Sequence, residues 1–282
     1  MGATQSQQEP QSQSQSESQP QPQPQAQLQQ HHHQPHETTK RETWLLSPGR
    51  NTKPSKSNST KAVVDNNARA VKSNETGSMM PHNYEHILKD ADSPVDKSCS
   101  RGKLFDLLYA GVFLDHKTKK YWVDKRSNSN CFMLYARALS ITWAENPIYW
   151  KWVQQKEASG TMTELAELKR VCWLEVEGKF DTTKLSPGIL YQVSFIVMLK
   201  NGANEGWEIP INVRLEIPGG KKQEHKENLL EKSRESWVEI PVGEFVASEK
   251  DVGEMKIFMY EYEGGMWKTG LIIKGIVIKP KN

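Results

Sequence analysis

Hydrophobic and polar residues alternate in several short segments in the second part of the chain. The clearest of these runs from residue 207 to 217, where every odd position is apolar and every even position is polar or proline. A period of two is typical of a β-strand with one buried face. Because Pro210 has no backbone donor, we expect this strand to lie at a sheet edge or to be bulged at that point.

Other segments share this alternation or are apolar throughout. Residues 191–199 and 255–259 alternate, whereas residues 271–279 are apolar on both faces and are predicted to form a central, buried strand. Residues 111–114 and 121–123 flank a polar loop, which predicts a hairpin.

The remaining periodic segments complete an all-β pattern. Residues 237–242 predict another strand, and residues 163–170 fit either a short helix that begins at a threonine cap or an extended lead into residues 171–176. Strands recur roughly every ten to fifteen residues with no long helix between them. We therefore expect a two-layer antiparallel β-sandwich, for which about 170 residues supply an ample core.

The first hundred residues have a different composition. Residues 1 to about 36 are dominated by Gln, Ser and Pro, and residues 37–100 are rich in Ser, Asn, Lys and Thr. Such segments cannot bury enough apolar surface to offset their ordering entropy. We expect residues 1–100 to be a disordered Gln/Ser/Pro/His-rich tail and linker, and residues 101–282 to be the folded domain. The histidines at 31–33 and 36 have no partner ligands at fixed spacing, so no metal site is expected.

Charge and cysteine content exclude several classes of protein. The formal net charge of +3 is too small by itself to hold the protein on nucleic acid, which needs clustered basic side chains. Three scattered cysteines, Cys99, Cys131 and Cys172, are expected to be buried or inert thiols. No apolar run reaches membrane-spanning length and no secretory signal is present, so we expect a cytoplasmic and also a nuclear location.

The first six residues, MGATQS, fit the pattern for N-terminal acylation. Gly2 is therefore a candidate myristoylation site. A single acyl chain without a second signal gives only weak, reversible contact with a membrane.

An unusual cluster of aromatic residues surrounds one Asn-Pro pair. Residues 140–152 hold three tryptophans and a tyrosine around Asn146 and Pro147. Proline fixes its own φ and pushes the preceding residue toward an extended conformation, so the flanking segments should meet at a corner. Trp143 and Trp150 lie on either side of it. Their rings can pack into a core or form a platform for a planar or ring-shaped ligand, and from the chemistry alone both readings stay open.

Five ordered blocks resemble those of the plant phloem-protein-two, or Nictaba-like, lectin family. They cover residues 121–124, 136–143, 149–152, 168–176 and 267–275. The resemblance extends over about residues 111–282. It implies a jelly-roll-like sandwich that binds chitin oligomers and N-glycan cores without catalysis, located in the cytoplasm and nucleus or in phloem sieve elements.

The resemblance also implies a binding site made of Trp143, Trp150, Glu254 and Glu261. Indole faces stack on the apolar face of N-acetylglucosamine, and carboxylates accept charge-assisted hydrogen bonds from hydroxyl groups. The two glutamates are seven residues apart, which on a regular strand places them on opposite faces. Unless Gly253 leaves Glu254 in a loop or a bulge intervenes, only one of them can line the pocket. The other tryptophans considered, at 152, 173, 237 and 267, are expected to pack in the core.

The sequence therefore predicts a non-enzymatic lectin that recognises N-acetylglucosamine oligomers or N-glycan cores on glycoproteins, in phloem or in defence and stress responses. No catalytic residue, cofactor or metal is expected. Weak single sites would gain avidity in a homodimer.

The alternative is an RNA-binding phloem protein that acts in long-distance ribonucleoprotein transport. In this reading Tyr121 and Trp122 stack bases, and the nearby basic residues Lys119, Lys120, Lys125 and Arg126 screen phosphates.

Overall fold

The computed structural model describes residues 1–2, 79–96, 98–250 and 252–281. Most of the predicted disordered tail, including the histidines at 31–33 and 36, lies outside the described residues. The last part of the predicted linker, from residue 79 onward, is described.

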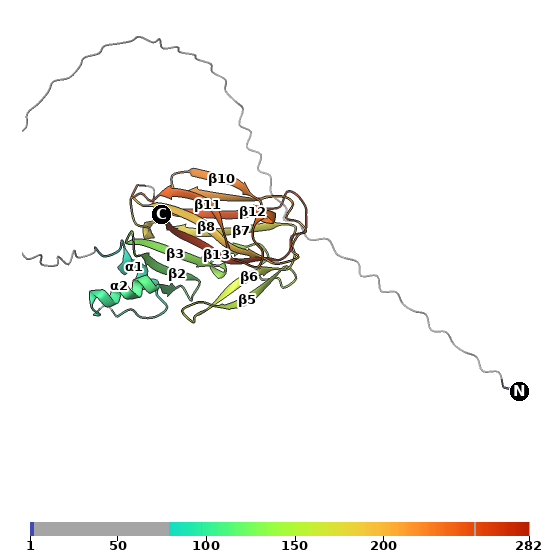
Figure 1. Cartoon of the computed structure of the whole chain (residues 1–282), viewed down its shortest axis with the longest axis horizontal. Coiled ribbons are helices and arrows are strands. Elements are labelled where there is room, and N and C mark those ends of the chain that lie inside the picture. The colour runs from blue at the N-terminus through green and yellow to red at the C-terminus, as the bar shows by residue number, and fades with distance from the viewer. Residues whose placement is uncertain (3–78, 97, 251, 282) are drawn as a thin grey trace, which may run out of the picture. The chain divides into compact units, whose positions relative to one another are not determined.

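Thirteen strands in this part of the chain form two antiparallel sheets (Figure 1). The eight-stranded sheet contains β1 (Val112–Leu114), β2 (Lys119–Asp124), β3 (Ser129–Tyr135), β5 (Trp150–Lys156), β6 (Met162–Leu168), β8 (Leu190–Leu199), β11 (Val238–Val246) and β13 (Leu271–Pro280). The five-stranded sheet has the order β10 (Lys221–Glu227), β9 (Ile211–Ile217), β12 (Glu254–Glu261), β7 (Leu174–Asp181) and β4 (Ser140–Ile141). The predicted antiparallel β-sandwich is confirmed.

Helical segments are short and lie at the start of the domain or between strands. They are α1 (Tyr84–Ile87), η1 (Leu88–Asp90), α2 (Arg101–Ala110), η2 (Ala136–Ala138), η3 (Thr182–Lys184) and η4 (Leu229–Glu231). The sequence pattern did not predict α2, which buries Phe105 and Leu108.

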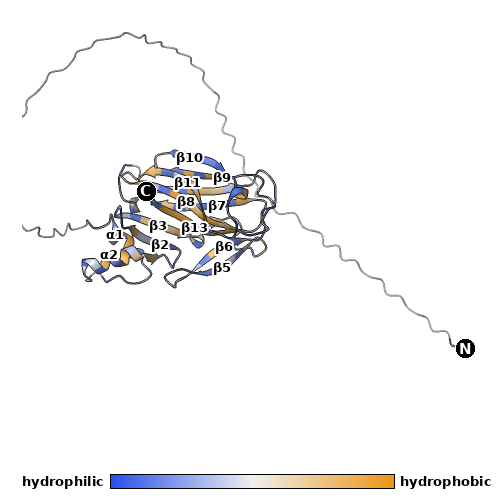
Figure 2. Ribbon diagram, viewed as in Figure 1, coloured by the Kyte–Doolittle hydropathy of each residue, from blue (hydrophilic) through white to orange (hydrophobic). Residues whose placement is uncertain are grey.

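The alternating segments form the walls of the core. Along β9 and β12, buried side chains alternate without interruption with side chains that are partly or fully exposed. Strand β13 pairs with β3, β6 and β8, so the prediction of a central strand is confirmed. Figure 2 shows it as mostly hydrophobic, whereas the edge strand β10 is hydrophilic. Pro210 directly precedes β9, so its missing donor costs no ladder hydrogen bond.

Residues 163–170 do not form a helix. Residues 162–168 are strand β6, which pairs with all seven residues of β5. Leu165 and Leu168 are three residues apart, a spacing that also suits a helix, but the partner strand decides the conformation.

The folded domain begins before the predicted boundary at residue 101. A segment of residues 79–96, called here the N-terminal strap, packs on the sandwich and buries Ile87 completely. Asp92 accepts hydrogen bonds from the backbone N–H groups of His116 (2.6 Å) and Lys117 (2.7 Å) in the β1–β2 turn. Asp90 pairs with Lys184 at 3.0 Å. The strap is therefore part of the domain and not a linker.

The Asn-Pro corner carries the chain from one sheet to the other. Strand β4, before the corner, pairs with β7 in the five-stranded sheet, and β5, after it, pairs with β6 in the eight-stranded sheet. The aromatic residues of the corner therefore lie where the two layers are joined.

Candidate carbohydrate-binding site

Local hydrogen bonds fix the shape of the corner. The carbonyl of Asn146 accepts from the N–H groups of Tyr149 (3.0 Å) and Trp150 (3.1 Å), and its side-chain oxygen accepts from Ile148 N–H at 3.0 Å. Trp143 has φ of 60°, a left-handed conformation that is rare for a bulky residue. Backbone strain of this kind often occurs at functional sites.

The two tryptophans of the predicted platform have different surroundings. Trp150 is only 2% exposed, and its indole N–H donates to the carbonyl of Thr142 at 3.1 Å. Its faces are enclosed by the core, so it offers no surface for stacking. Trp143 is half-buried, with its ring 5.3 Å from that of Tyr149 and tilted by 40°. Of the predicted pair, only Trp143 reaches the surface.

The two glutamates lie at opposite ends and on opposite faces of one strand. Glu254 is the first residue of β12 and Glu261 is the last, and the pairing with β7 is continuous between them, with no bulge. Seven residues of strand separate them by about 23 Å. Glu254 points outward and is exposed, whereas Glu261 points inward and is 2% exposed. The structure does not bring the two carboxylates together.

Glu261 forms a buried ion pair with Lys268. The ammonium group of Lys268, itself 0% exposed, also donates to the carbonyls of Cys172 (3.0 Å) and Met266 (3.1 Å). One carboxylate oxygen of Glu261 accepts from the N–H of Gly264 at 2.8 Å. These bonds tie the end of β12 to the loop before β13, which is a structural role.

Trp143 lines an open cleft at the corner with a volume of about 380 Å³. The cleft is bordered by Arg137, Leu139, Ser140, Ile141, Trp143, Ala144, Glu145 and Trp152. Trp152 is half-buried, and the guanidinium carbon of Arg137 lies 3.5 Å from the centre of its ring. The side chain of Glu145 is 79% exposed. The cleft thus combines two indoles, a cation and a carboxylate.

Sequence reasoning missed Arg137, Glu145 and Trp152. Trp150 and Trp152 are two residues apart on β5 and share one face, so alternation alone cannot show which of them is covered. Glu145 lies only two residues after Trp143, and this short separation is the sequence feature that could have identified it as a neighbour of the tryptophan.

The tryptophans at 152, 173, 237 and 267 were expected in the core, and that expectation is only partly correct. Trp173 and Trp237 are half-buried, and Trp267 is 38% exposed with Arg170 lying 4.4 Å from its ring centre. By contrast, Trp207 is completely buried, and its indole N–H donates to Thr269 O at 2.9 Å.

Aromatic rings also form a row on the outer face of the five-stranded sheet. Trp173 and Tyr262 stack at 4.3 Å, Tyr262 and Tyr260 stack at 5.3 Å, and Arg214 lies over the rings of Tyr260 and Phe258. These side chains cover one another's faces. The row therefore offers a flat platform less readily than the cleft does.

The base-stacking surface proposed for RNA is not present as predicted. Tyr121 is completely buried, and its hydroxyl donates to Asn130 at 2.9 Å. Burial raises the pKa of this phenol well above its usual value. Trp122 packs against Met133 and Tyr135 on the outer face of the eight-stranded sheet. Tyr121 cannot stack on a base without unfolding of the strand.

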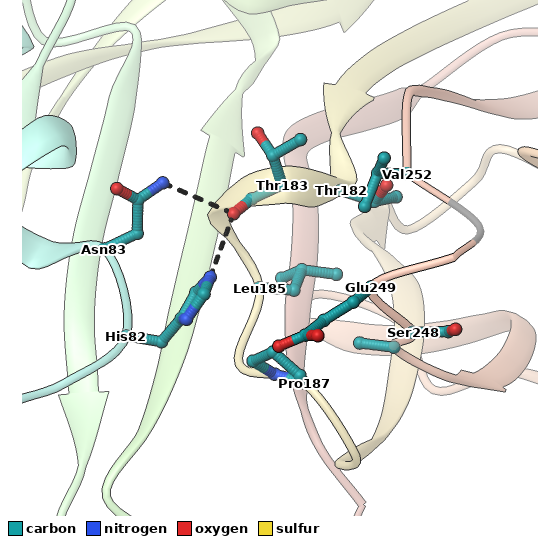
Figure 3. A pocket seen from close by; sticks show the side chains of 10 residues that line it. His82, Asn83, Thr182, Thr183, Leu185, Pro187, Ser248, Glu249 and Val252 are labelled. Carbon is teal, nitrogen blue, oxygen red and sulfur yellow. Dashed lines mark hydrogen bonds between the residues drawn. The ribbon is translucent and has the colours of Figure 1, made fainter.

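A second hollow, of about 420 Å³, lies beside the N-terminal strap (Figure 3). His82 Nε2 and Asn83 Nδ2 lie 3.3 Å and 3.4 Å from the carbonyl oxygen of Thr183, so their polar atoms already bind the sandwich. Its lining contains no Trp, Tyr or Phe. A stacking ligand has no ring face to use there.

The described ranges contain no cluster of three His, Cys, Asp or Glu side chains that could hold a metal ion. Within the same residues, no helix is long and apolar enough to cross a membrane. Cys131 is buried, and burial raises the pKa of its thiol to about 12, as expected for an inert thiol.

The fold and the cleft define a β-sandwich protein with a surface cleft lined by indole rings and a carboxylate. Residues 129–280 match the family model described as Phloem protein 2. The chain belongs to this family, and the predicted resemblance is confirmed.

Two relatives each match the chain over about 200 residues. The chain is 50% identical over 204 residues to Protein PHLOEM PROTEIN 2-LIKE A1 of Arabidopsis thaliana. This match covers 71% of the chain and 81% of that protein. It is 45% identical over 201 residues to a protein named Lectin from Luffa acutangula. This second match covers 71% of the chain and 94% of the relative. Neither name is that of an enzyme, in agreement with the prediction.

Among solved structures, the xylan-binding domain CBM22-1 of Paenibacillus barcinonensis Xyn10C matches with 12% identity and a TM-score of 0.31, over 52% of this chain and 87% of that chain. A score this low supports no inference about the ligand.

Proposed function

We propose that this protein is a lectin that binds N-acetylglucosamine oligomers or N-glycan cores, without catalysis, in the cleft beside Trp143. The observation that carries the proposal is the position of Trp143, whose half-buried ring lines a cleft that also holds a second indole and an exposed carboxylate. Stacking of a pyranose on an indole and hydrogen bonding of its hydroxyl groups to a carboxylate are complementary contacts. The 45% identity to the Luffa protein named Lectin supports a carbohydrate ligand.

The size and openness of the cleft fit a short oligosaccharide. Its volume of about 380 Å³ lies in the range of small-molecule sites. Because it is open at the surface, a chain of sugars can extend beyond it, as recognition of a glycan on a protein requires. Single contacts of about 0.5–3 kcal/mol predict modest affinity for each site.

The test compares two tryptophan variants of the full-length protein. We expect Trp143→Ala to lose retention on an immobilised chito-oligosaccharide column and to keep a cooperative thermal melt. Trp267→Ala is the matched control, because Trp267 is exposed and lies outside the cleft. Unchanged retention of the Trp143→Ala variant would show that the cleft is not the sugar site.

A further inference from the structure

A chain of hydrogen bonds joins the Trp143 cleft to the outer face of the five-stranded sheet. Ser140, on the edge strand β4, lines the cleft. Thr142, directly before Trp143, donates its N–H to the carbonyl of Glu175 on β7 at 3.1 Å and its hydroxyl to Oε2 of that side chain at 3.3 Å. The same Oε2 accepts from the indole N–H of Trp173 at 3.0 Å. The cleft therefore borders the sheet face on which Trp173 lies.

Trp173 is the end ring of the aromatic row formed by Trp173, Tyr262 and Tyr260. The register of β7 with β12 places Trp173 opposite Tyr262, which stacks on one face of the indole at 4.3 Å. Strand β7 has β4 as its other neighbour, so the second face of this indole is turned to the side where the corner begins. No other ring of the described residues stacks on Trp173, which is half-buried. A sugar leaving the cleft thus meets the uncovered face of Trp173.

Two polar groups beside this ring have no hydrogen-bond partner within the described ranges. They are Oε1 of Glu175 and the hydroxyl group of Tyr262. Burial and, after it, the carboxylate of Glu175 raise the pKa of the Tyr262 phenol, so its hydroxyl is protonated at neutral pH and can donate. An indole face with a carboxylate acceptor beside it is the combination that Trp143 and Glu145 supply in the cleft. The apolar face and the hydroxyl groups of a pyranose complement both positions.

We propose that Trp173, Glu175 and Tyr262 form a second sugar subsite, which binds a further unit of the glycan whose first unit stacks on Trp143. This inference rests on the proposed lectin function and extends it from one cleft to a track over the edge of the five-stranded sheet. The occupant is the same oligosaccharide, because Thr142 and Glu175 link the two positions directly. The protein should therefore prefer longer oligomers, since only these reach both rings at once.

The experiment measures the association constants of chitobiose and chitotetraose with the full-length protein by isothermal titration calorimetry. In the wild-type protein, the constant for chitotetraose should exceed that for chitobiose by about tenfold or more, because the tetramer gains a second stacking contact and its hydrogen bonds. In Trp173→Ala, the ratio of the two constants should fall about fivefold, the loss expected for one ring contact. The affinity for chitobiose should stay at the wild-type value, because Trp173 lies outside the cleft.

Two further variants make the test independent of the fold of Trp173→Ala. Tyr262→Phe keeps the stacked rings and breaks no hydrogen bond within the described residues, so its thermal melt should match that of the wild-type protein. Its ratio should fall about threefold, as expected for one lost hydrogen bond. Trp122→Ala is the matched control, because Trp122 is also half-buried on an outer sheet face, but on the eight-stranded sheet. It should leave the ratio unchanged.

A folded Trp173→Ala or Tyr262→Phe protein that keeps the wild-type ratio would overturn the second subsite, and so would an equal fall in Trp122→Ala. If chitotetraose binds the wild-type protein no more tightly than chitobiose while Trp143→Ala loses both, the subsite is wrong and the lectin proposal stands. If the wild-type protein binds neither sugar nor any glycan on an array, both proposals fail.

Discussion

The ion pair between Glu261 and Lys268 allows a test of whether the Glu261 carboxylate stabilises the fold or binds the sugar. Family resemblance assigns Glu261 to the sugar site, whereas the structure buries it against an ammonium group that is 0% exposed. Glu261→Gln removes one charge and leaves the other in a low-dielectric interior. Loss of one partner of a buried pair typically costs about 3–5 kcal/mol, because the remaining charge is uncompensated.

The lower end of that range is expected here. Lys268 keeps its hydrogen bonds to the carbonyls of Cys172 and Met266, which partly solvate the remaining charge. A loss of about 3 kcal/mol corresponds to a fall in the melting temperature of roughly 6 to 12 °C for a domain of this size. The assay is thermal unfolding followed by circular dichroism, with urea unfolding as a second measure of the free energy.

Two further variants separate charge from shape. Glu254→Gln is the matched control, because its side chain is 54% exposed and 3.8 Å from Lys179, and a solvated pair contributes less than about 1 kcal/mol. The double variant Glu261→Leu with Lys268→Met removes both charges together and should recover much of the lost stability. Below the lowered melting temperature, Glu261→Gln should bind chitotriose as the wild-type protein does. A wild-type melt combined with lost sugar binding would refute this reasoning and return Glu261 to the binding site.

Two other predictions concern long-range ties of the fold. Asp92→Ala should lower the free energy of unfolding by about 1.5–3 kcal/mol in urea titrations, because its carboxylate accepts two backbone hydrogen bonds from the β1–β2 turn. Asp106→Ala, on the exposed face of α2, should have no such effect. Gln223→Met should cost about 1–3 kcal/mol by the same measurement, because its amide donates to Glu244 O at 2.6 Å and accepts from Glu244 N–H at 3.0 Å, joining the edge strands β10 and β11 of the two sheets. An unchanged unfolding free energy in either variant would show that the tie is dispensable.

Strands whose pattern is a local property could be predicted from the sequence. β8, β9 and β12 alternate because each has one face on the core, and the two-sided apolar pattern of β13 reflects the burial of both its faces. The sequence left two conformations open for residues 163–170, and the partner strand selects the extended one. Residues 162–168 tolerate a helix locally, and only their pairing with β5 makes them a strand.

The N-terminal strap could not be predicted for a related reason. Its apolar residues are few, and composition placed it with the disordered tail. Its burial depends on partners distant in sequence, since Asp92 binds the turn at residues 116–117 and Asp90 pairs with Lys184. A short segment with few apolar side chains can fold when a preformed surface satisfies its polar groups.

The family resemblance was a weaker guide to the positions of the proposed site tryptophans and glutamates than strand geometry was. The seven-residue separation of Glu254 and Glu261 already required opposite faces on a regular strand, and β12 is regular. Glu261, the inward-pointing glutamate, is buried, and a buried carboxylate needs a cationic partner, which is Lys268. Glu145 lies outside any strand, on a corner whose backbone is fixed by its own turn, so its carboxylate is free to reach solvent beside Trp143. A carboxylate that must meet a sugar at the surface is therefore better sought on this corner than at the inward end of a core strand.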